Sequence, residues 1–115
     1  MAVNNYIQFQ TLADIDTATI AGGTFGAVNP AGLTIPCFLI RITSTCNKDC
    51  YISFDGVTNH EFLPSDATVV LPFQYIGQPN NFTAMLKKGT IVWVKPVEAA
   101  TGHVRLSGYC QASAV

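Results

Sequence analysis

The sequence has little charge. Six basic and seven acidic residues among 115 make up 11% of the chain, and the net charge is −1; the charged share is less than half of the roughly 25% usual in globular proteins. The charges are scattered, and Lys87 and Lys88 are the only adjacent basic residues. Clustered lysine and arginine side chains drive binding to nucleic-acid phosphates. We therefore expect no nucleic-acid partner.

Long apolar runs are missing as well. No segment approaches the roughly 18 consecutive apolar residues of a membrane-spanning helix, so we expect no membrane partner. The first residues, MAVNNY, lack the basic region and the apolar stretch of a secretory signal. We therefore expect the chain to be made, and to fold, in a cytoplasm.

The motifs of nucleotide, phosphate and zinc sites do not occur either. The chain contains no GxGxxG, no GxxxxGK followed by Ser or Thr, and no HExxH, the patterns that bring backbone N–H groups or metal ligands together. A zinc ion bound by Cys46 and Cys50 would need two further ligands, and no second closely spaced Cys or His pair is present. We expect no cofactor and no metal ion.

The four cysteines, Cys37, Cys46, Cys50 and Cys110, allow more than one interpretation. In a reducing compartment the default is four free thiols, with each buried cysteine packed as a small apolar side chain. Cys46 and Cys50 flank a three-residue turn, so they could also face each other and form a disulfide after exposure to oxidising conditions. Cys46 and Cys50 are therefore the candidate disulfide, with free thiols as the alternative.

Short strand patterns separated by turn residues are what the sequence has in abundance. Residues 1–35, rich in Ala, Thr, Gly and Asn, predict an extended N-terminal arm with one or two short strands. From residue 36 onward, runs of alternating, β-branched or aromatic residues recur about every ten residues between Gly, Pro, Asn and Asp. The runs that we expect to form strands are 37–43, 51–54, 57–62, 68–74, 82–86, 90–95 and 103–110.

This pattern, with no long helix competing, predicts an all-β protein. We expect an antiparallel β-sandwich or jelly roll over residues 36–115, preceded by the arm over 1–35. Residues 90–95 (TIVWVK) are the strongest strand pattern. Their alternation does not decide whether Trp93 or the pair Val92 and Val94 faces the core.

A catalytic triad can be drawn on paper from Ser53, Asp55 and His60. Nearness in sequence is no evidence for a triad, because its members normally come from separate elements. We favour a polar hairpin whose side chains hydrogen-bond their own backbone. We expect no catalytic residues and no enzymatic activity.

The same loop offers oxygen ligands for calcium. They are Asp55, Thr58, Asn59 and Glu61. A defined calcium loop has alternating acidic ligands, and here one carboxylate stands at each end, which would bind weakly. The polar hairpin therefore remains the favoured interpretation.

Several segments between residues 38 and 111, about two thirds of the chain, together carry a family likeness. They are 39–43 (LIRIT), 52–60 (ISFDGVTNH), 71–74 (LPFQ), 78–82 (QPNNF), 86–90 (LKKGT) and 108–109 (GY). Together they resemble a family of small virion proteins of tailed bacteriophages. The resemblance implies a jelly-roll or β-sandwich protein without catalytic residues, which sits on the capsid as cement or decoration or joins tail components. It also implies a virion location and binding to the major capsid protein and to other copies of itself, as a dimer or trimer.

Three functions follow as hypotheses. The first is a capsid cement or decoration protein that bridges neighbouring capsid subunits. The second is a tail, collar or fibre-base component of the virion, present in far fewer copies. The third is a carbohydrate-binding module, which needs exposed aromatic side chains in a groove, and Trp93 is the only tryptophan that could serve.

Overall fold

The computed structural model describes residues 4–72, 75–77, 82–84 and 86–114, and their side chains over 7–72 and 86–110. Strands dominate this part of the chain. The elements in chain order are β1 (Asn4–Asp16), a short 3-10 turn η1 (Thr17–Thr19), β2 (Gly26–Ala27), β3 (Cys37–Ser44), β4 (Cys50–Ser53), β5 (Glu61–Leu63), β6 (Thr68–Pro72), β7 (Tyr75–Gly77), β8 (Phe82–Ala84), β9 (Trp93–Pro96) and β10 (His103–Ala114). The prediction of an all-β sandwich is confirmed.

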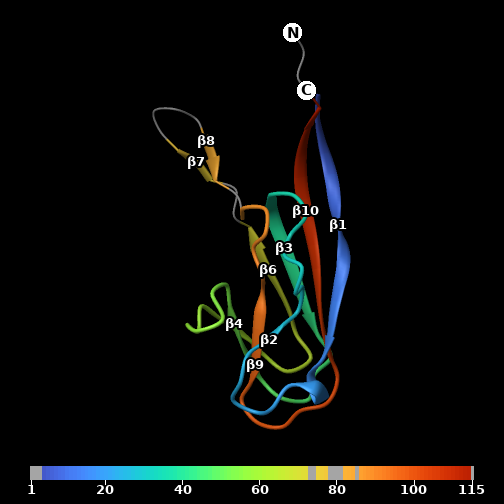
Figure 1. The fold of residues 1–115 in the computed structure, drawn as a ribbon, viewed down its shortest axis with the longest axis vertical. Helices are drawn as coiled ribbons and strands as arrows, with labels where there is room; N and C mark the ends of the chain where they lie inside the picture. The colour runs from blue at the N-terminus through green and yellow to red at the C-terminus, as the bar shows by residue number, and fades with distance from the viewer. Residues whose placement is uncertain (1–3, 73–74, 78–81, 85, 115) are drawn as a thin grey trace.

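The strands form two antiparallel sheets of four strands each. One sheet has the order β1-β10-β3-β6 and the other the order β2-β9-β4-β5, while β7 and β8 form a separate hairpin (Figure 1). The chain changes sheet six times: between β1 and β2, β2 and β3, β3 and β4, β5 and β6, β6 and β9 (by way of the β7–β8 hairpin), and β9 and β10. These crossings hold the two sheets face to face, as a sandwich requires.

The core lies between the sheets and is built from alternating side chains. In β3, Ile40 and Ile42 are fully buried while Arg41 between them is exposed, which is the two-residue period of a strand with one covered face. The sequence left the orientation of residues 90–95 open, and Val92 and Val94 are the buried pair. Other fully buried apolar side chains are Cys37, Cys46, Cys50, Ile52, Leu63, Val104, Leu106 and Cys110.

Residues 1–35 contain a longer strand than we expected. We expected one or two short strands, but β1 spans 13 residues and pairs antiparallel with β10, with a register shift between Gln10 and Ala13. Strand pairing uses backbone groups that every residue except proline can offer, so the polar composition of this segment is no obstacle. Val28 and Leu33 are buried in the core. The division of the chain into an arm and a domain near residue 35 stays a prediction.

Together β1 and β10 extend past the rest of the sandwich. The molecule measures 54 × 27 × 21 Å along its principal axes. Figure 1 shows β1 and β10 continuing as a two-stranded ribbon beyond the end of β3. Because β1 is the outermost strand of its sheet, its outer backbone edge has no neighbouring strand among the described residues, and past the end of β3 the same holds for the second edge of β10.

Two expected strands, 68–74 and 82–86, lie partly outside the described residues, which leave out 73–74 and 85. In the described parts of these segments the structure has β6 and β8. No helix in the described ranges is long and apolar enough to cross a membrane.

Candidate functional site

The end of β4 and the loop between β4 and β5 hold the three residues of the triad drawn from the sequence. Ser53 is fully buried, and its hydroxyl donates a hydrogen bond to Asp55 Oδ1 at 2.8 Å. The same hydroxyl oxygen accepts from the backbone N–H groups of Asp55 at 3.2 Å and Gly56 at 2.9 Å. Each bond spans two or three residues, as is typical of polar side chains that fix a turn. The Ser53 hydroxyl is therefore occupied by the loop itself.

Asp55 fixes the tip of the same loop. Its Oδ1 also accepts from the backbone N–H groups of Thr58 and Val57, each at 2.8 Å. These bonds, and the one from Ser53, stabilise the charged form and hold the pKa of the Asp55 carboxyl well below its usual range. Gly56 adopts a φ of +77°, which glycine tolerates best. The Asp-Gly turn is thus held by its own aspartate.

His60 does not stand where a triad needs it. Its Nδ1 accepts from the backbone N–H of Phe54 at 3.0 Å, and its Nε2 lies 4.0 Å from Asp55 Oδ2. In a working triad the histidine stands between the serine and the acid and takes the serine proton, whereas here Ser53 bonds to the acid directly. The structure brings the three residues together, and their contacts hold the hairpin.

The calcium ligands considered from the sequence belong to the same loop. Asp55 Oδ1 already accepts three hydrogen bonds, from Ser53, Val57 and Thr58. Within the described ranges, no three His, Cys, Asp or Glu side chains gather in a way that could hold a metal ion. The geometry gives the Asp55 carboxylate a role in the turn.

The cysteines pair differently from the sequence-based candidate. A disulfide joins Cys37 of β3 to Cys110 of β10, whose Cα atoms are 3.9 Å apart. Cys46 and Cys50, the candidate pair, are buried free thiols: Cys46 Sγ accepts from the backbone N–H of Lys48 at 3.4 Å, and the Cys50 thiol donates to the Lys48 carbonyl at 3.7 Å. Burial, and then the neighbouring Cys46, raise the pKa of the Cys50 thiol to about 12. Both sulfurs are thus hydrogen-bonded to the turn between them.

The outer face of the sheet β2-β9-β4-β5 carries aromatic side chains in a line. In the strand register Tyr51 lies opposite Lys95 on one side and Phe62 on the other. The ring centroids of Tyr51 and Phe62 are 5.6 Å apart. Lys95 Nζ lies 5.6 Å from the Tyr51 ring centroid and 4.8 Å from that of Phe25, next to β2. We call Phe25, Lys95, Tyr51 and Phe62 the aromatic row.

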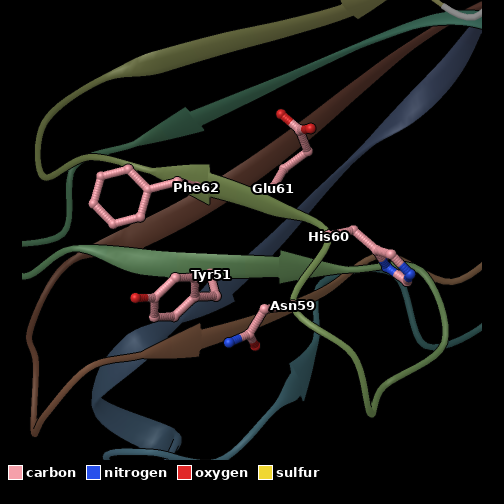
Figure 2. A pocket seen from close by; sticks show the side chains of 5 residues that line it. All are labelled: Tyr51, Asn59, His60, Glu61 and Phe62. Atoms are coloured by element: carbon pink, nitrogen blue, oxygen red, sulfur yellow. The ribbon is translucent and has the colours of Figure 1, made fainter.

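A hollow opens at the Phe62 end of the aromatic row. It has a volume of about 280 Å³ and is lined by Tyr51, Asn59, His60, Glu61 and Phe62 (Figure 2). Successive strand residues point to opposite faces, so Phe62 shares a face with Tyr51 and Glu61 does not. Figure 2 shows the Glu61 carboxylate directed away from Tyr51 and Asn59. The open side of the hollow therefore presents the rings of Tyr51 and Phe62 and the Asn59 amide.

Trp93, the aromatic residue that the sequence offered for a sugar site, shares the outer face of β9 with Lys95 but does not line the hollow. It is half-buried, and a Cβ added to Gly56 would lie 3.0 Å from its ring, so the β4–β5 loop covers it. Sequence reasoning missed Tyr51 and Phe62 as a pair. The pairing register of β4 and β5 brings them together, and alternation within single segments does not reveal that register.

The free edge of β1 is the second candidate site. On this strand Ile7, Phe9 and Leu12 have exposed fractions of 62%, 71% and 57%. Residues 4–13 (NNYIQFQTLA) contain no charge and no proline. A groove of about 380 Å³ lies beside the strand, between residues 10–14 and the loop 28–34. We call residues 4–13 of this strand the β1 edge.

No protein-family model, curated protein or solved structure matches this chain. The geometry of the β1 edge, of the aromatic row and of the hollow, together with the resemblance of the sequence segments, is therefore the basis for assigning a function.

Proposed function

We propose that the protein is a structural subunit of a tailed-bacteriophage virion, a capsid cement or decoration protein that binds neighbouring capsid subunits and other copies of itself through the β1 edge. The virion assignment rests on the resemblance of the segments between residues 38 and 111. The mode of binding rests on the β1 edge. The role is structural and needs no catalytic group.

The contrast between β1 and the other outer strands carries this proposal. Natural sheets protect their edges by short strands, prolines or charges, because an open edge pairs with other chains. The outer strands of the described sheets follow this rule: β2 has two residues, β6 ends at Pro72, and β5 begins at Glu61 and is followed by Pro64. The β1 edge has no charge and no proline, and its one register shift, between Gln10 and Ala13, leaves residues 4–10 as a regular open strand. This supports a role in binding another strand.

The exposed apolar side chains set the strength of this contact. Fully burying an exposed side chain of this kind contributes about 1.5–3 kcal/mol. Because Ile7, Phe9 and Leu12 are 62%, 71% and 57% exposed, burying what remains exposed contributes about 3–6 kcal/mol for the three together. Association costs about 4–15 kcal/mol in lost freedom of motion. A single β1 contact is therefore weak in isolation. It becomes useful where many contacts act together, as on a capsid lattice.

Copy number in purified particles tests the proposal. We expect about one copy for each major capsid subunit, because a cement protein follows the symmetry of the lattice that it binds. Quantitative mass spectrometry of particles measures this ratio. A ratio lower by about two orders of magnitude, as symmetry implies for a tail or collar component, would overturn the cement assignment.

Particles that lack the protein give a second test. If it bridges capsid subunits, such particles open and release their DNA at a lower temperature than complete ones. Purified protein added back should restore the original release temperature. Release at an unchanged temperature would contradict the proposal.

A further inference from the structure

We infer that the aromatic row and its hollow form a binding site for an acidic polysaccharide, one whose sugar rings carry carboxylates. This site lies on the sheet β2-β9-β4-β5, whereas the β1 edge belongs to the other sheet. The inference is therefore independent of the proposed assembly role.

The aromatic rings supply the surface for a sugar ring. Phe62 has an exposed fraction of 46%, and its ring meets that of Tyr51 at an interplanar angle of 64°. A pyranose ring has an apolar face of C–H groups that packs against an aromatic ring, with weak attraction between those hydrogens and the negative ring face. The two rings at an angle form a corner in which one sugar ring can lie.

The hollow supplies polar contacts of the right kind. Sugar sites combine an apolar wall with a few polar groups that fix orientation. The exposed Asn59 amide and the Tyr51 hydroxyl both donate and accept hydrogen bonds, and Figure 2 places these side chains on the same side of the strand pair. The volume of about 280 Å³ suits a single sugar ring, with the rest of the polymer outside.

Lys95 indicates a negatively charged ligand. Its ammonium group is held against the rings of Phe25 and Tyr51, and within the described ranges no carboxylate lies within 4.0 Å of it. Lys48, by contrast, pairs with Glu98 at 3.0 Å. A carboxylate bound at Lys95 would form a charge-assisted hydrogen bond. The Glu61 carboxylate also lines the hollow but points away from Tyr51 and Asn59 (Figure 2), so we place the carboxylate of the ligand at the Lys95 end of the aromatic row.

Titration of the ¹⁵N-labelled full chain with a hexamer of galacturonic acid tests the site. A neutral glucose hexamer of equal length is the matched probe. We expect amide shifts at residues 51, 59–62 and 93–95, with tighter binding of the acidic hexamer. If millimolar acidic hexamer produced no shifts, or shifts only at other residues, the inference would be overturned.

Two variants distinguish the contribution of aromatic stacking to hexamer binding from the contribution of the Lys95 charge. Phe62→Ala should weaken binding of the acidic hexamer by about tenfold or more, as loss of a stacked aromatic does, whereas Phe9→Ala on the other sheet should leave it unchanged. Lys95→Gln should remove the preference for the acidic over the neutral hexamer, and Lys88→Gln should retain it. Because Phe62 and Lys95 are on the outer face, circular dichroism should show folded variants. Unchanged affinity of Phe62→Ala, or a retained preference in Lys95→Gln, would contradict the inference.

Discussion

At the residue scale, the Asp55 carboxylate fixes the β4–β5 loop by accepting three hydrogen bonds. Asp55→Ala removes an oxygen that accepts from Ser53, Val57 and Thr58, while Asp55→Asn keeps one acceptor oxygen and loses the charge. We expect the melting temperature at neutral pH to fall in both variants, and further in the alanine variant. Calorimetry of the wild type and the two variants measures the order of their melting temperatures.

The stability from Asp55 should also depend on pH. Its pKa is lowered by folding from about 3.9 in unfolded chains. Stability from the charged form is therefore fully present above that unfolded value and is lost as the pH falls through the lower folded pKa. The gap in melting temperature between the wild type and Asp55→Asn should narrow as the pH falls below about 4. Glu61→Gln is the control. If the gap in melting temperature between the wild type and Glu61→Gln narrowed equally, the assignment of the pH dependence to Asp55 would be contradicted.

Counting the reactive thiols of the native, the unfolded and the reduced protein tests the assignment of the four cysteines. We expect no alkylation in the native protein, because Cys46 and Cys50 are buried and the pKa of Cys50 is raised to about 12, which suppresses the reactive thiolate. Unfolding without a reductant should expose two thiols, and reduction should expose four. Intact mass measures each count. Four thiols without a reductant would exclude the Cys37–Cys110 disulfide.

Removing the disulfide should also lower stability. Cys37 and Cys110 are 73 residues apart, and cross-linking a loop of that length stabilises the folded state by up to about 4 kcal/mol in the chain-entropy account. The double variant Cys37→Ala, Cys110→Ala should unfold at a lower denaturant concentration. The matched variant Cys46→Ala, Cys50→Ala removes two buried sulfurs that form no cross-link. It should therefore lose less stability than the variant without the disulfide.

At the element scale, turns fix where the chain crosses between sheets. Gly102, between β9 and β10, has a φ of +110°, and a Cβ there would meet the carbonyl oxygen of Thr45. Gly23 has a φ of +78° but no atom within 4 Å of such a Cβ. We expect Gly23→Ala to cost about 1–2 kcal/mol from backbone strain alone. Gly102→Ala should cost about 1–3 kcal/mol more because of overpacking. Urea unfolding of the two variants measures the difference in their free energies of unfolding. Equal losses of stability would contradict the prediction.

The individual strands could be predicted where local pattern decides them. Residues 37–43 alternate and become β3, and residues 103–110 become the start of β10. Residues 57–62 do not form the expected strand, because Asp55 holds 57 and 58 in the turn and β5 begins only at Glu61. Strand patterns report side-chain burial, whereas this boundary depends on side-chain bonds to the backbone.

The pairing of strands could not be predicted in the same way. The Cys37–Cys110 disulfide, the length of β1 and the aromatic row all depend on which strand lies beside which, and in what register. A single sequence contains no signal for such contacts between distant residues. The local Ser53, Asp55 and His60 cluster was visible for the opposite reason, since its members lie within eight residues.

At the scale of the whole molecule, the low charge and the protruding ribbon both support the proposal that the protein assembles through the β1 edge. A chain with 11% charged residues has little charge to keep copies apart, which favours association. Strand β1 carries three of the exposed large apolar side chains, Ile7, Phe9 and Leu12, and Ile7 lies on the ribbon itself. The Cys37–Cys110 disulfide suits a protein that meets oxidising surroundings, as a released phage particle does.

Charging the β1 edge should therefore abolish assembly and leave the fold intact. The double variant Ile7→Lys, Phe9→Lys places two lysines on a strand edge, the device by which natural edges avoid pairing. Both side chains are more than half exposed, and Phe9 loses only its edge contact with the Tyr109 ring, so the melting temperature should fall only slightly. Binding to particles that lack the protein, measured by co-sedimentation, should be lost. Val57→Lys, at a site 80% exposed in the β4–β5 loop, should bind like the wild type. If the β1 variant binds as well as Val57→Lys, the contact to the capsid lies elsewhere on the molecule.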